Sequence, residues 1–277
     1  MSASSNHNEF ASSGQPRAQH SAIITGACSG LGYASARHLL SKGWNVALLD
    51  LNEEVGKQRV SEFGVEFGDS HCQFYQVDVT SDTQVESVIA KVFSDFDAKP
   101  RLCLNCAGVA PAKRTLDRES NPMPLANFAD TININLIGSF NVARVAASHL
   151  SKNDALGEAN ERGVIINTAS VAGFEGQIGQ TAYAASKGGI IGLALPMARD
   201  LAPLGIRVNT IAPGVMGTPM LLGMPENVQE ALVSNVQFPK RLGLPEEFAK
   251  LVEHMFDNKY LNGETVRLDG ALRMPPK

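Results

Sequence analysis

A tyrosine and a lysine lie four residues apart, shortly after a serine, in a stretch that could transfer a proton. Residues 166–189 read INTASVAGFEGQIGQTAYAASKGG and contain Ser170, Tyr183 and Lys187. In a helix, residues i and i+4 share one face, so the lysine ammonium would lie beside the phenol. A nearby cation lowers the pKa of a phenol from its ordinary value of about 10. Tyr183 could then take a proton from an alcohol as hydride leaves its carbon, while the Ser170 hydroxyl holds the substrate oxygen.

A fourth polar residue, Asn135, lies in an apolar helical stretch that reads NINLIG. A buried amide is costly unless it is hydrogen-bonded, and Asn135 could hold a water molecule in a proton path to Lys187. Each of these residues also has a structural explanation. A Tyr–Lys pair at helical spacing is common, and a serine at the end of a strand is usually a cap. Their joint occurrence behind a glycine-rich loop favours a catalytic site.

That loop reads TGACSGLG (25–32), and its glycines are Gly26, Gly30 and Gly32. It follows a predicted strand and opens a predicted helix. A tight turn without Cβ atoms lets the backbone approach a pyrophosphate, and the helix N-terminus offers free N–H groups. Glycines also serve in helix caps and β-bulges, but the strand-loop-helix context favours cofactor binding.

Two aspartates end the second and third predicted strands. Asp50 could accept hydrogen bonds from both ribose hydroxyls of an adenosine and would repel a 2′-phosphate. No arginine or lysine follows directly in DLNEE, and none lies in residues 27–31, so the sequence predicts NAD rather than NADP. Asp78 could receive the adenine amino group, with Val79 packing on the ring. Asp50 could instead only cap the turn that follows it, and Asp78 could be a simple N-cap of the next helix.

The fourth predicted strand ends in the small residues of NCAG (105–108). Here Cys106, Ala107 and Gly108 would let a cofactor approach the backbone closely. Cys103 and Cys106 form a CxxC, but no second CxxC and no nearby histidine would complete a zinc site. Residues three apart on a strand point to opposite faces, so we expect buried, unpaired thiols, with a redox pair as the alternative.

These motifs are positioned by alternating short apolar runs and longer helical stretches. The predicted strands are 21–25, 45–50, 72–77, 101–105, 163–169, 206–212 and 265–269. The predicted helices are 31–42, 53–63, 81–97, 125–151, 180–202, 226–236 and 246–257. The alternation predicts one doubly wound α/β domain, with a mostly parallel sheet flanked by helices on both faces.

Two polar stretches interrupt the alternation. Residues 110–128 contain three prolines and follow the carboxyl end of a strand, the side on which open α/β sheets bind ligands. Residues 151–162 lie at the opposite end of the sheet, and we expect them to have a structural or assembly role. Loops of this length in a compact domain are often functional or mobile.

Composition limits the remaining possibilities. The chain has 277 residues, of which 44% are hydrophobic and 19% charged, and its net charge is −4. These values favour a large core and give no electrostatic case for broad binding to nucleic acid or anionic membrane. The most apolar stretch, residues 188–198, is too short to cross a bilayer. The six histidines lie outside every motif, and we expect no metal site.

Residues 1–19 are rich in serine, asparagine and glutamine, and we expect them to form a disordered extension before a catalytic domain at 20–277. They lack the apolar segment of a secretory signal, and Arg17 is the only arginine before residue 37. The chain has only four cysteines, and their spacing shows no disulfide framework, which suggests a reducing compartment. We therefore expect a cytoplasmic protein, with the mitochondrial matrix as the alternative.

TGACSGLG, NCAG, Asn135, Ser170, YAASK (183–187) and PG (213–214) together resemble the short-chain dehydrogenase/reductase family. The resemblance implies a seven-stranded Rossmann-type sheet and a nicotinamide cofactor. It also implies a catalytic tetrad consisting of Asn135, Ser170, Tyr183 and Lys187, in which the lysine binds the nicotinamide ribose. By the same resemblance, further cofactor contacts fall at Ser29, Leu31, Pro213, Met216 and Thr218.

Longer blocks, among them GVIINTASVAGFEGQIGQTAYAASKGGI and ARDLAPLGIRVNTIAPGVMGTPML, are similar to the 3-hydroxyacyl-CoA dehydrogenase type 2 branch of that family. Members of this branch are NAD-dependent homotetramers of acyl degradation that also accept some steroids. Gln177 and Gln180 fall in the branch's substrate-facing loop. The 110–128 loop differs in detail, so a hydroxysteroid dehydrogenase and a 3-oxoacyl-carrier-protein reductase remain alternatives. A non-catalytic scaffold is disfavoured because all four tetrad residues are present.

Overall fold

The computed structural model describes residues 20–68 and 71–276, so the expected disordered segment 1–19 lies outside the described residues. Seven strands form one sheet in the order β3-β2-β1-β4-β5-β6-β7, and every neighbouring pair is parallel. The strands are β1 (Ser21–Thr25), β2 (Asn45–Asp50), β3 (Cys72–Gln76), β4 (Pro100–Asn105), β5 (Gly163–Thr168), β6 (Ile206–Pro213) and β7 (Thr265–Leu268). The strand order reverses between β1 and β4, which places a ligand-binding crevice at their carboxyl ends.

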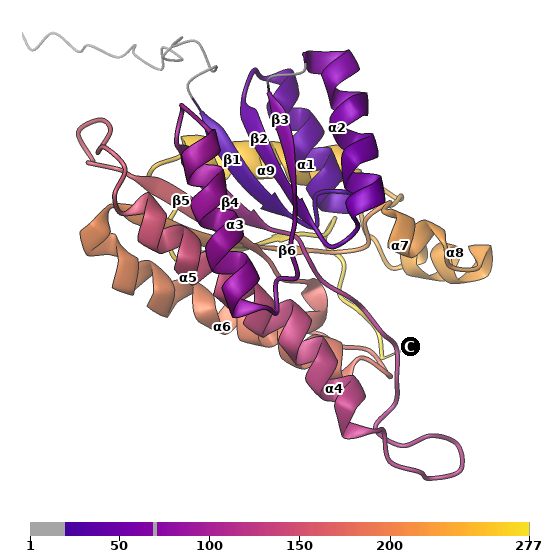
Figure 1. The fold of residues 1–277 in the computed structure, drawn as a ribbon. Coiled ribbons are helices and arrows are strands. Elements are labelled where there is room, and N and C mark those ends of the chain that lie inside the picture. The colour runs from indigo at the N-terminus through magenta and orange to yellow at the C-terminus, as the bar shows by residue number, and fades with distance from the viewer. Residues whose placement is uncertain (1–19, 69–70, 277) are drawn as a thin grey trace, which may run out of the picture.

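Helices cover both faces of this sheet, as the sequence predicts (Figure 1). Those on one face are α1 (Gly30–Ser41), α2 (Glu53–Phe67) and α9 (Pro245–Asp257), and those on the other are α3 (Asp82–Asp95), α5 (Gly138–Leu150) and α6 (Thr181–Leu201). Three further helices lie beyond the carboxyl edge: α4 (Leu125–Ile132), α7 (Pro219–Leu222) and α8 (Glu226–Ser234). The doubly wound fold class is therefore confirmed.

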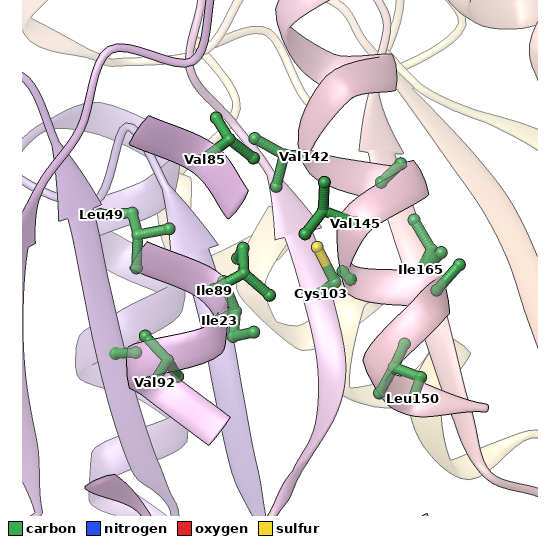
Figure 2. Packing of buried hydrophobic residues seen from close by; sticks show 14 of the residues in the cluster. Ile23, Leu49, Val85, Ile89, Val92, Cys103, Val142, Val145, Leu150 and Ile165 are labelled. Carbon is green, nitrogen blue, oxygen red and sulfur yellow. The ribbon is translucent and has the colours of Figure 1, made fainter. Parts of the chain in front are cut away.

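The core consists of two main clusters separated by the sheet. On the α3–α5 face, side chains from both helices point at the strands (Figure 2). Ile89 and Val145 are buried there against Ile23 and Cys103. The other cluster is built around Leu39, Phe63 and Phe248 on the opposite face, together with the remaining side chains of the same strands. Strands covered on both faces are mostly apolar, which explains their apolar runs, although β6 also buries Arg207, Asn209 and Thr210.

Helix α2 is longer than predicted. The sequence predicts an end at Phe63, but the helix continues past Gly64 to Phe67, and Gly68, with a φ of +97°, is its C-cap. Phe67 packs against Phe63 with ring centroids 6.1 Å apart. This tertiary contact outweighs the cost of about 1 kcal/mol for a glycine inside a helix.

The predicted helix 125–151 is continuous but contains a π-helical turn at Asn133–Ile137 between α4 and α5. Short π segments inside α-helices occur mostly at functional sites, and this one carries Asn135. Helix α4 begins at Leu125, as predicted for the helix 125–151, and so takes up the last residues of the 110–128 stretch. No helix in the described parts of the chain is long and apolar enough to span a membrane.

The 151–162 segment forms a turn with paired backbone at Leu156 and Glu161, at the amino end of the strands. Glu161 makes an ion pair of 3.1 Å with Arg207 of β6, and both side chains are buried. Arg207 also donates to the carbonyl oxygens of Met255 and Phe256 at the end of α9, at 2.8 Å each. The segment therefore helps to join β6 to α9, which is the structural role that the sequence predicts.

Candidate active site

A cavity of about 1250 Å³ lies at the carboxyl edge of the sheet. It gathers nearly all of the residues singled out from the sequence, although they come from the ends of six strands, the loops that follow them and helix α6. Its lining includes Gly26, Ser29, Gly30, Leu31, Gly32, Asp50, Asp78, Val79, Cys106, Ala107, Gly108, Ser170, Gln177, Gln180, Tyr183, Lys187, Pro213, Met216 and Thr218. Asn135 is the one predicted site residue that does not line the cavity.

The glycine-rich loop is shaped by close backbone contacts. Gly26 has a φ of +61°, and a Cβ there would lie 2.8 Å from the backbone nitrogen of Ala107. A Cβ on Gly32 would lie 2.3 Å from the carbonyl oxygen of Gly26. No side chain fits at either position, so the loop folds against the start of α1 and leaves the helix N-terminus facing the cavity. This cradle fits a dinucleotide pyrophosphate.

Asp50 serves the loop as well as the cavity. Its carboxylate accepts hydrogen bonds from the backbone nitrogens of Cys28, at 3.1 Å, and Asn52, at 3.2 Å. The N-cap of α2 is Asn52, not Asp50. Asp50 therefore stabilises the turn that follows it, and its side chain also remains part of the cavity wall, where it would meet the adenosine ribose.

Arg59 of α2 supports the same loop, and we did not predict it from the sequence. Its Nε donates to the carbonyl oxygen of Cys28 at 3.1 Å, and its guanidinium lies 4.6 Å from the ring centroid of Tyr33. An ion pair with Glu62 balances its charge. Arg59 lies 31 residues after Cys28, and no local sequence signal links the two.

Asp78 forms a local turn at the end of β3. Its Oδ1 accepts from the backbone nitrogen of Thr80 at 2.9 Å and from the Thr80 hydroxyl at 2.7 Å. The N-cap of α3 is Ser81, so the simple capping alternative for Asp78 is not what the structure shows. Asp78 and Val79 both border the cavity beside the end of β2, where an adenine ring would lie.

Ser170, Tyr183 and Lys187 meet at the carboxyl end of β5. The Ser170 side chain is hydrogen-bonded to the Tyr183 phenol. The Lys187 Nζ lies 5.8 Å from the centroid of the Tyr183 ring and donates to the carbonyl oxygen of Thr168 at 2.7 Å. The three side chains therefore face one end of the cavity, as proton transfer to a substrate oxygen requires.

The pKa directions differ from the sequence-based expectation. Burial raises the pKa of Tyr183, and the hydrogen bond from Ser170 only partly offsets that increase. Burial also lowers the pKa of Lys187 from 10.5 to about 8. We expected the ammonium to lower the pKa of the phenol. In the structure, however, the Lys187 amine points to the backbone of β5, and low polarity dominates at both groups.

Asn135 is fully buried and uses its side chain to position the backbone around the site. Its Oδ1 accepts from the Val109 nitrogen at 2.8 Å. Its Nδ2 donates to the Val109 carbonyl at 2.9 Å and to the Ser186 hydroxyl at 3.0 Å. Both amide hydrogens are therefore engaged, and the residue ties the turn after β4 to α6. Its part in a proton path stays a prediction.

The four cysteines are free. Cys103 packs in the cluster on the α3–α5 face, whereas Cys106 packs against the cluster on the opposite face, as the strand geometry predicts. The Cys106 sulfur lies 3.3 Å from the Thr168 hydroxyl at the cavity wall. Burial raises the pKa of each of the four thiols to about 12.

The outer wall of the cavity is the part that we missed. It is formed by apolar side chains of α7, of α8 and of the turn between them, and by one residue near the end of the chain: Met220, Leu221, Met224, Val228, Leu232 and Met274. A start signal for α7 exists in the sequence, because Thr218 is followed by a proline at the first helical position and Gly223 follows the helix. Nothing in the sequence points to Met274.

The fold and the site define a class of protein. A family model for short chain dehydrogenases matches residues 20–229, and the chain belongs to this family. The family assignment made from the sequence is thus confirmed, and with it the expectation of an enzyme.

Individual relatives are more specific. The chain is 48% identical over 256 residues to 3-hydroxyacyl-CoA dehydrogenase type-2 of Bos taurus, a match that covers 92% of this chain and 95% of that protein. It is 35% identical to (3R)-3-hydroxyacyl-CoA dehydrogenase of Mus musculus, over 91% of this chain and 96% of that protein. The crystal structure of 3-hydroxyacyl-CoA dehydrogenase type-2 from Mycobacterium avium superposes with a TM-score of 0.87 at 41% identity and covers 94% of this chain and 98% of that one.

Proposed function

We propose that the protein interconverts 3-hydroxyacyl-CoA and 3-oxoacyl-CoA with NAD as the hydride carrier, in the degradation of fatty or branched-chain acyl groups. One observation carries the proposal. A single cavity joins the glycine-rich loop and Asp50 at one end to Ser170, Tyr183 and Lys187 at the other. The names of the relatives with 48% and 41% identity support the substrate class.

In the proposed reaction, the Ser170 and Tyr183 hydroxyls hold the substrate oxygen. Tyr183 accepts the hydroxyl proton during oxidation and returns it during reduction. Bound NAD supplies the hydride acceptor, and its positive ring would favour the phenolate and so act against the burial that raises the pKa of Tyr183. Lys187, held by the carbonyl of Thr168, would bind the nicotinamide ribose. Asn135 fixes the turn that carries Gly108, beside the Lys187 amine.

The choice of NAD over NADP rests on Asp50. A carboxylate at the end of β2 would accept the ribose hydroxyls and repel a 2′-phosphate. Arg59, which is bonded to the carbonyl oxygen of Cys28 in the glycine-rich loop, is paired with Glu62, so its charge is already balanced. This arrangement supports NAD.

The first experiment mixes purified protein with NAD⁺ or NADP⁺ and follows the absorbance of the reduced nicotinamide. The substrates are both enantiomers of 3-hydroxybutyryl-CoA and, in parallel, a hydroxysteroid. We expect strong NAD⁺-dependent oxidation of the (S)-thioester. Preference for the (R)-thioester would reverse the proposed stereochemistry of the substrate and would favour an activity like that of the mouse (3R)-3-hydroxyacyl-CoA dehydrogenase. Activity with NADP⁺ alone would favour the biosynthetic reductase, and oxidation of the steroid alone would overturn the thioester assignment.

We also propose a homotetramer. Large apolar side chains are exposed on the α5–α6 side of the molecule, among them Phe140 and Leu195, of which 44% and 46% of the surface is accessible. Exposed apolar residues on neighbouring helices are typical of subunit interfaces. Light scattering on the purified protein would test the proposal, and a mass of one subunit at micromolar concentration would contradict it.

A further inference from the structure

The last described segment of the chain, residues 269–276, runs along the end of the cavity where substrate would bind. Met274 lines the cavity there together with Gln177 and Ile178. These two residues belong to the loop between Ser170 and Tyr183. The far end of the chain therefore lies beside the loop that separates the proposed catalytic residues.

The segment is held in place by a network of ion pairs and hydrogen bonds. Arg267 of β7 binds both carboxylate oxygens of Glu175, at 2.8 and 3.0 Å, and Glu175 also accepts from the backbone nitrogen of Met274 at 3.2 Å. Arg267 donates in addition to the carbonyl oxygen of Leu272, a fully buried residue. A two-point arginine–carboxylate contact fixes orientation as well as distance. Glu175 therefore connects the substrate loop to the backbone of Met274.

Two more hydrogen bonds continue the connection beyond Met274. The side chain of Gln177 donates to the carbonyl oxygen of Pro275 at 3.1 Å. The backbone nitrogen of Ile178 donates to the carbonyl oxygen of Pro276, also at 3.1 Å. Two consecutive prolines restrict the backbone and leave only their carbonyl oxygens to bond. The segment is thus fastened to the loop on both sides of Met274.

The chemistry of the surrounding wall indicates what Met274 would contact. The same cavity is lined by apolar side chains of α7, α8 and the turn between them, including Met224 and Leu232. A thioether on a flexible, unbranched side chain adapts to apolar groups of different shapes. Between these walls, the apolar part of a substrate would be enclosed.

We propose that Met274 is a specificity-determining residue that contacts the alkyl chain of the substrate, and that Glu175 and Arg267 position it. The proposal rests on the proposed function only in that the alkyl chain belongs to a 3-hydroxyacyl thioester. Chain-length selectivity is the property that Met274 controls. The chemical step remains with Ser170, Tyr183 and Lys187.

The test compares kcat/KM for 3-hydroxyoctanoyl-CoA and 3-hydroxybutyryl-CoA. Met274→Ala removes the contact with the outer part of the longer chain, so we expect the octanoyl-to-butyryl ratio to fall about 3- to 10-fold. Met274→Trp narrows the space, and the ratio should fall at least tenfold while butyryl turnover persists. Leu204→Ala is the control, because Leu204 is exposed and precedes β6 at the opposite end of the sheet. Ratios equal to that of the wild type in both Met274 variants would overturn the proposal.

Glu175→Gln tests the positioning network. This variant keeps the shape of the side chain and loses the charge that binds Arg267. We expect the same change in chain-length ratio as for Met274→Ala, together with faster hydrogen exchange in residues 173–180. Glu66→Gln is the control, because it breaks an exposed ion pair between Glu66 of α2 and Arg37 of α1, outside the cavity. It should change neither the chain-length ratio nor the hydrogen exchange of residues 173–180. An unchanged ratio and unchanged exchange would remove Glu175 from the proposal.

A parallel series of 2-alkanols, from 2-butanol to 2-decanol, separates this proposal from the proposed function. These alcohols have an alkyl chain but no thioester. Turnover of the alkanols without turnover of the thioesters would overturn the thioester assignment alone. The dependence of alkanol turnover on chain length would then still decide for or against Met274.

Discussion

The Nζ atom of Lys187 lies 2.7 Å from the carbonyl oxygen of Thr168, so the lysine of the site is tied to the end of β5. The Thr168 side chain in turn contacts the sulfur of Cys106 at the end of β4. The position of the amine is therefore set by two neighbouring strands and not by the tyrosine four residues before it. This arrangement directs the amine to the backbone of β5 and leaves the Tyr183 phenol with Ser170 as its polar neighbour.

Tyr183→Phe removes the proposed proton acceptor and little else. We expect kcat to fall at least a hundredfold, the usual size of a general acid–base contribution, while the affinity for NADH stays near that of the wild type. Steady-state kinetics and NADH fluorescence titration measure the two quantities. Tyr260→Phe is the matched control because Tyr260 is fully exposed. Turnover like that of the wild type in Tyr183→Phe would defeat the assignment.

The buried amine of Lys187 predicts a pH-dependent stability in protein without NAD. Its pKa is about 8 in the folded protein, and we take the ordinary value of 10.5 for the unfolded chain. Between pH 8 and pH 10.5 the unfolded chain therefore binds more protons than the folded protein. Folding stability relative to a Lys187→Met variant should therefore rise as pH increases from about 8 towards 10. Below pH 8 the full cost of burying the ammonium, about 3 kcal/mol, is present.

Urea unfolding of the wild type and of Lys187→Met at about pH 7 and about pH 9.5 measures this effect. Taking the difference between the two proteins removes the contributions of groups that they share. If the free energy of unfolding of the wild type, minus that of Lys187→Met, stayed constant or fell at the higher pH, the lowered pKa would be contradicted.

Asp50→Asn should weaken discrimination between the two nicotinamide cofactors. The amide keeps an oxygen that can accept from the backbone of Cys28 and loses the negative charge that would repel a 2′-phosphate. We expect the ratio of kcat/KM for NAD⁺ over NADP⁺ to fall at least tenfold, which corresponds to about 1.4 kcal/mol. Asp200→Asn, on the exposed side of α6, is the control. A preserved ratio would mean that Asp50 acts only as support for the loop.

Gly32→Ala should damage the cradle of the glycine-rich loop. The added methyl group would lie 2.3 Å from the carbonyl oxygen of Gly26, so the turn must open. We expect a loss of stability of about 1–3 kcal/mol and at least a tenfold loss of NADH affinity. Gly192→Ala is the matched control: its Cβ meets nothing within 4 Å on α6, and it should raise stability by up to about 1 kcal/mol. Equal effects of the two variants would exclude the steric argument.

Arg207→Leu should destabilise the protein without changing the chemistry. The substitution leaves Glu161 with Lys259 as its remaining ionic partner and removes the arginine donor from the carbonyl oxygen of Met255 at the end of α9. Because Lys259 still compensates the charge of Glu161, we expect a loss of stability of about 1–3 kcal/mol. Thermal unfolding would show the loss, and KM for NAD⁺ should not change in the protein that remains folded. A stability within about 0.5 kcal/mol of the wild type would contradict the structural role of the 151–162 segment.

The fold was predictable because local patterns and long-range packing agree along most of the chain. Strand β1 occupies Ser21–Thr25, as the apolar run predicts, because its three central residues are apolar and buried and its polar residues stand only at the two ends. The exceptions arise where tertiary contacts decide. Phe67 extends α2 past Gly64, and the π-helical turn around Asn135 has no propensity signal of its own.

The site was predictable in its residues but less so in its electrostatics. Spacing alone placed Tyr183 and Lys187 on one face of α6, and the structure brings both to the cavity. Spacing could not show that Lys187 bonds to Thr168 or that burial raises the pKa of Tyr183, because both depend on residues brought in by β5. Arg59 and Met274 were missed for the same reason: each reaches the cavity or its loop from a remote part of the chain.

The buried thiols have a practical consequence for handling the protein. Burial raises the pKa of Cys28, Cys72, Cys103 and Cys106 to about 12, so very little of each thiol is ionised at neutral pH, and the thiolate is the reactive form. Alkylating reagents and mild oxidants should therefore inactivate the enzyme slowly, even though Cys106 borders the cavity. Storage in air without a reducing agent should preserve activity, and the rate of iodoacetamide modification should rise about tenfold with each unit of pH.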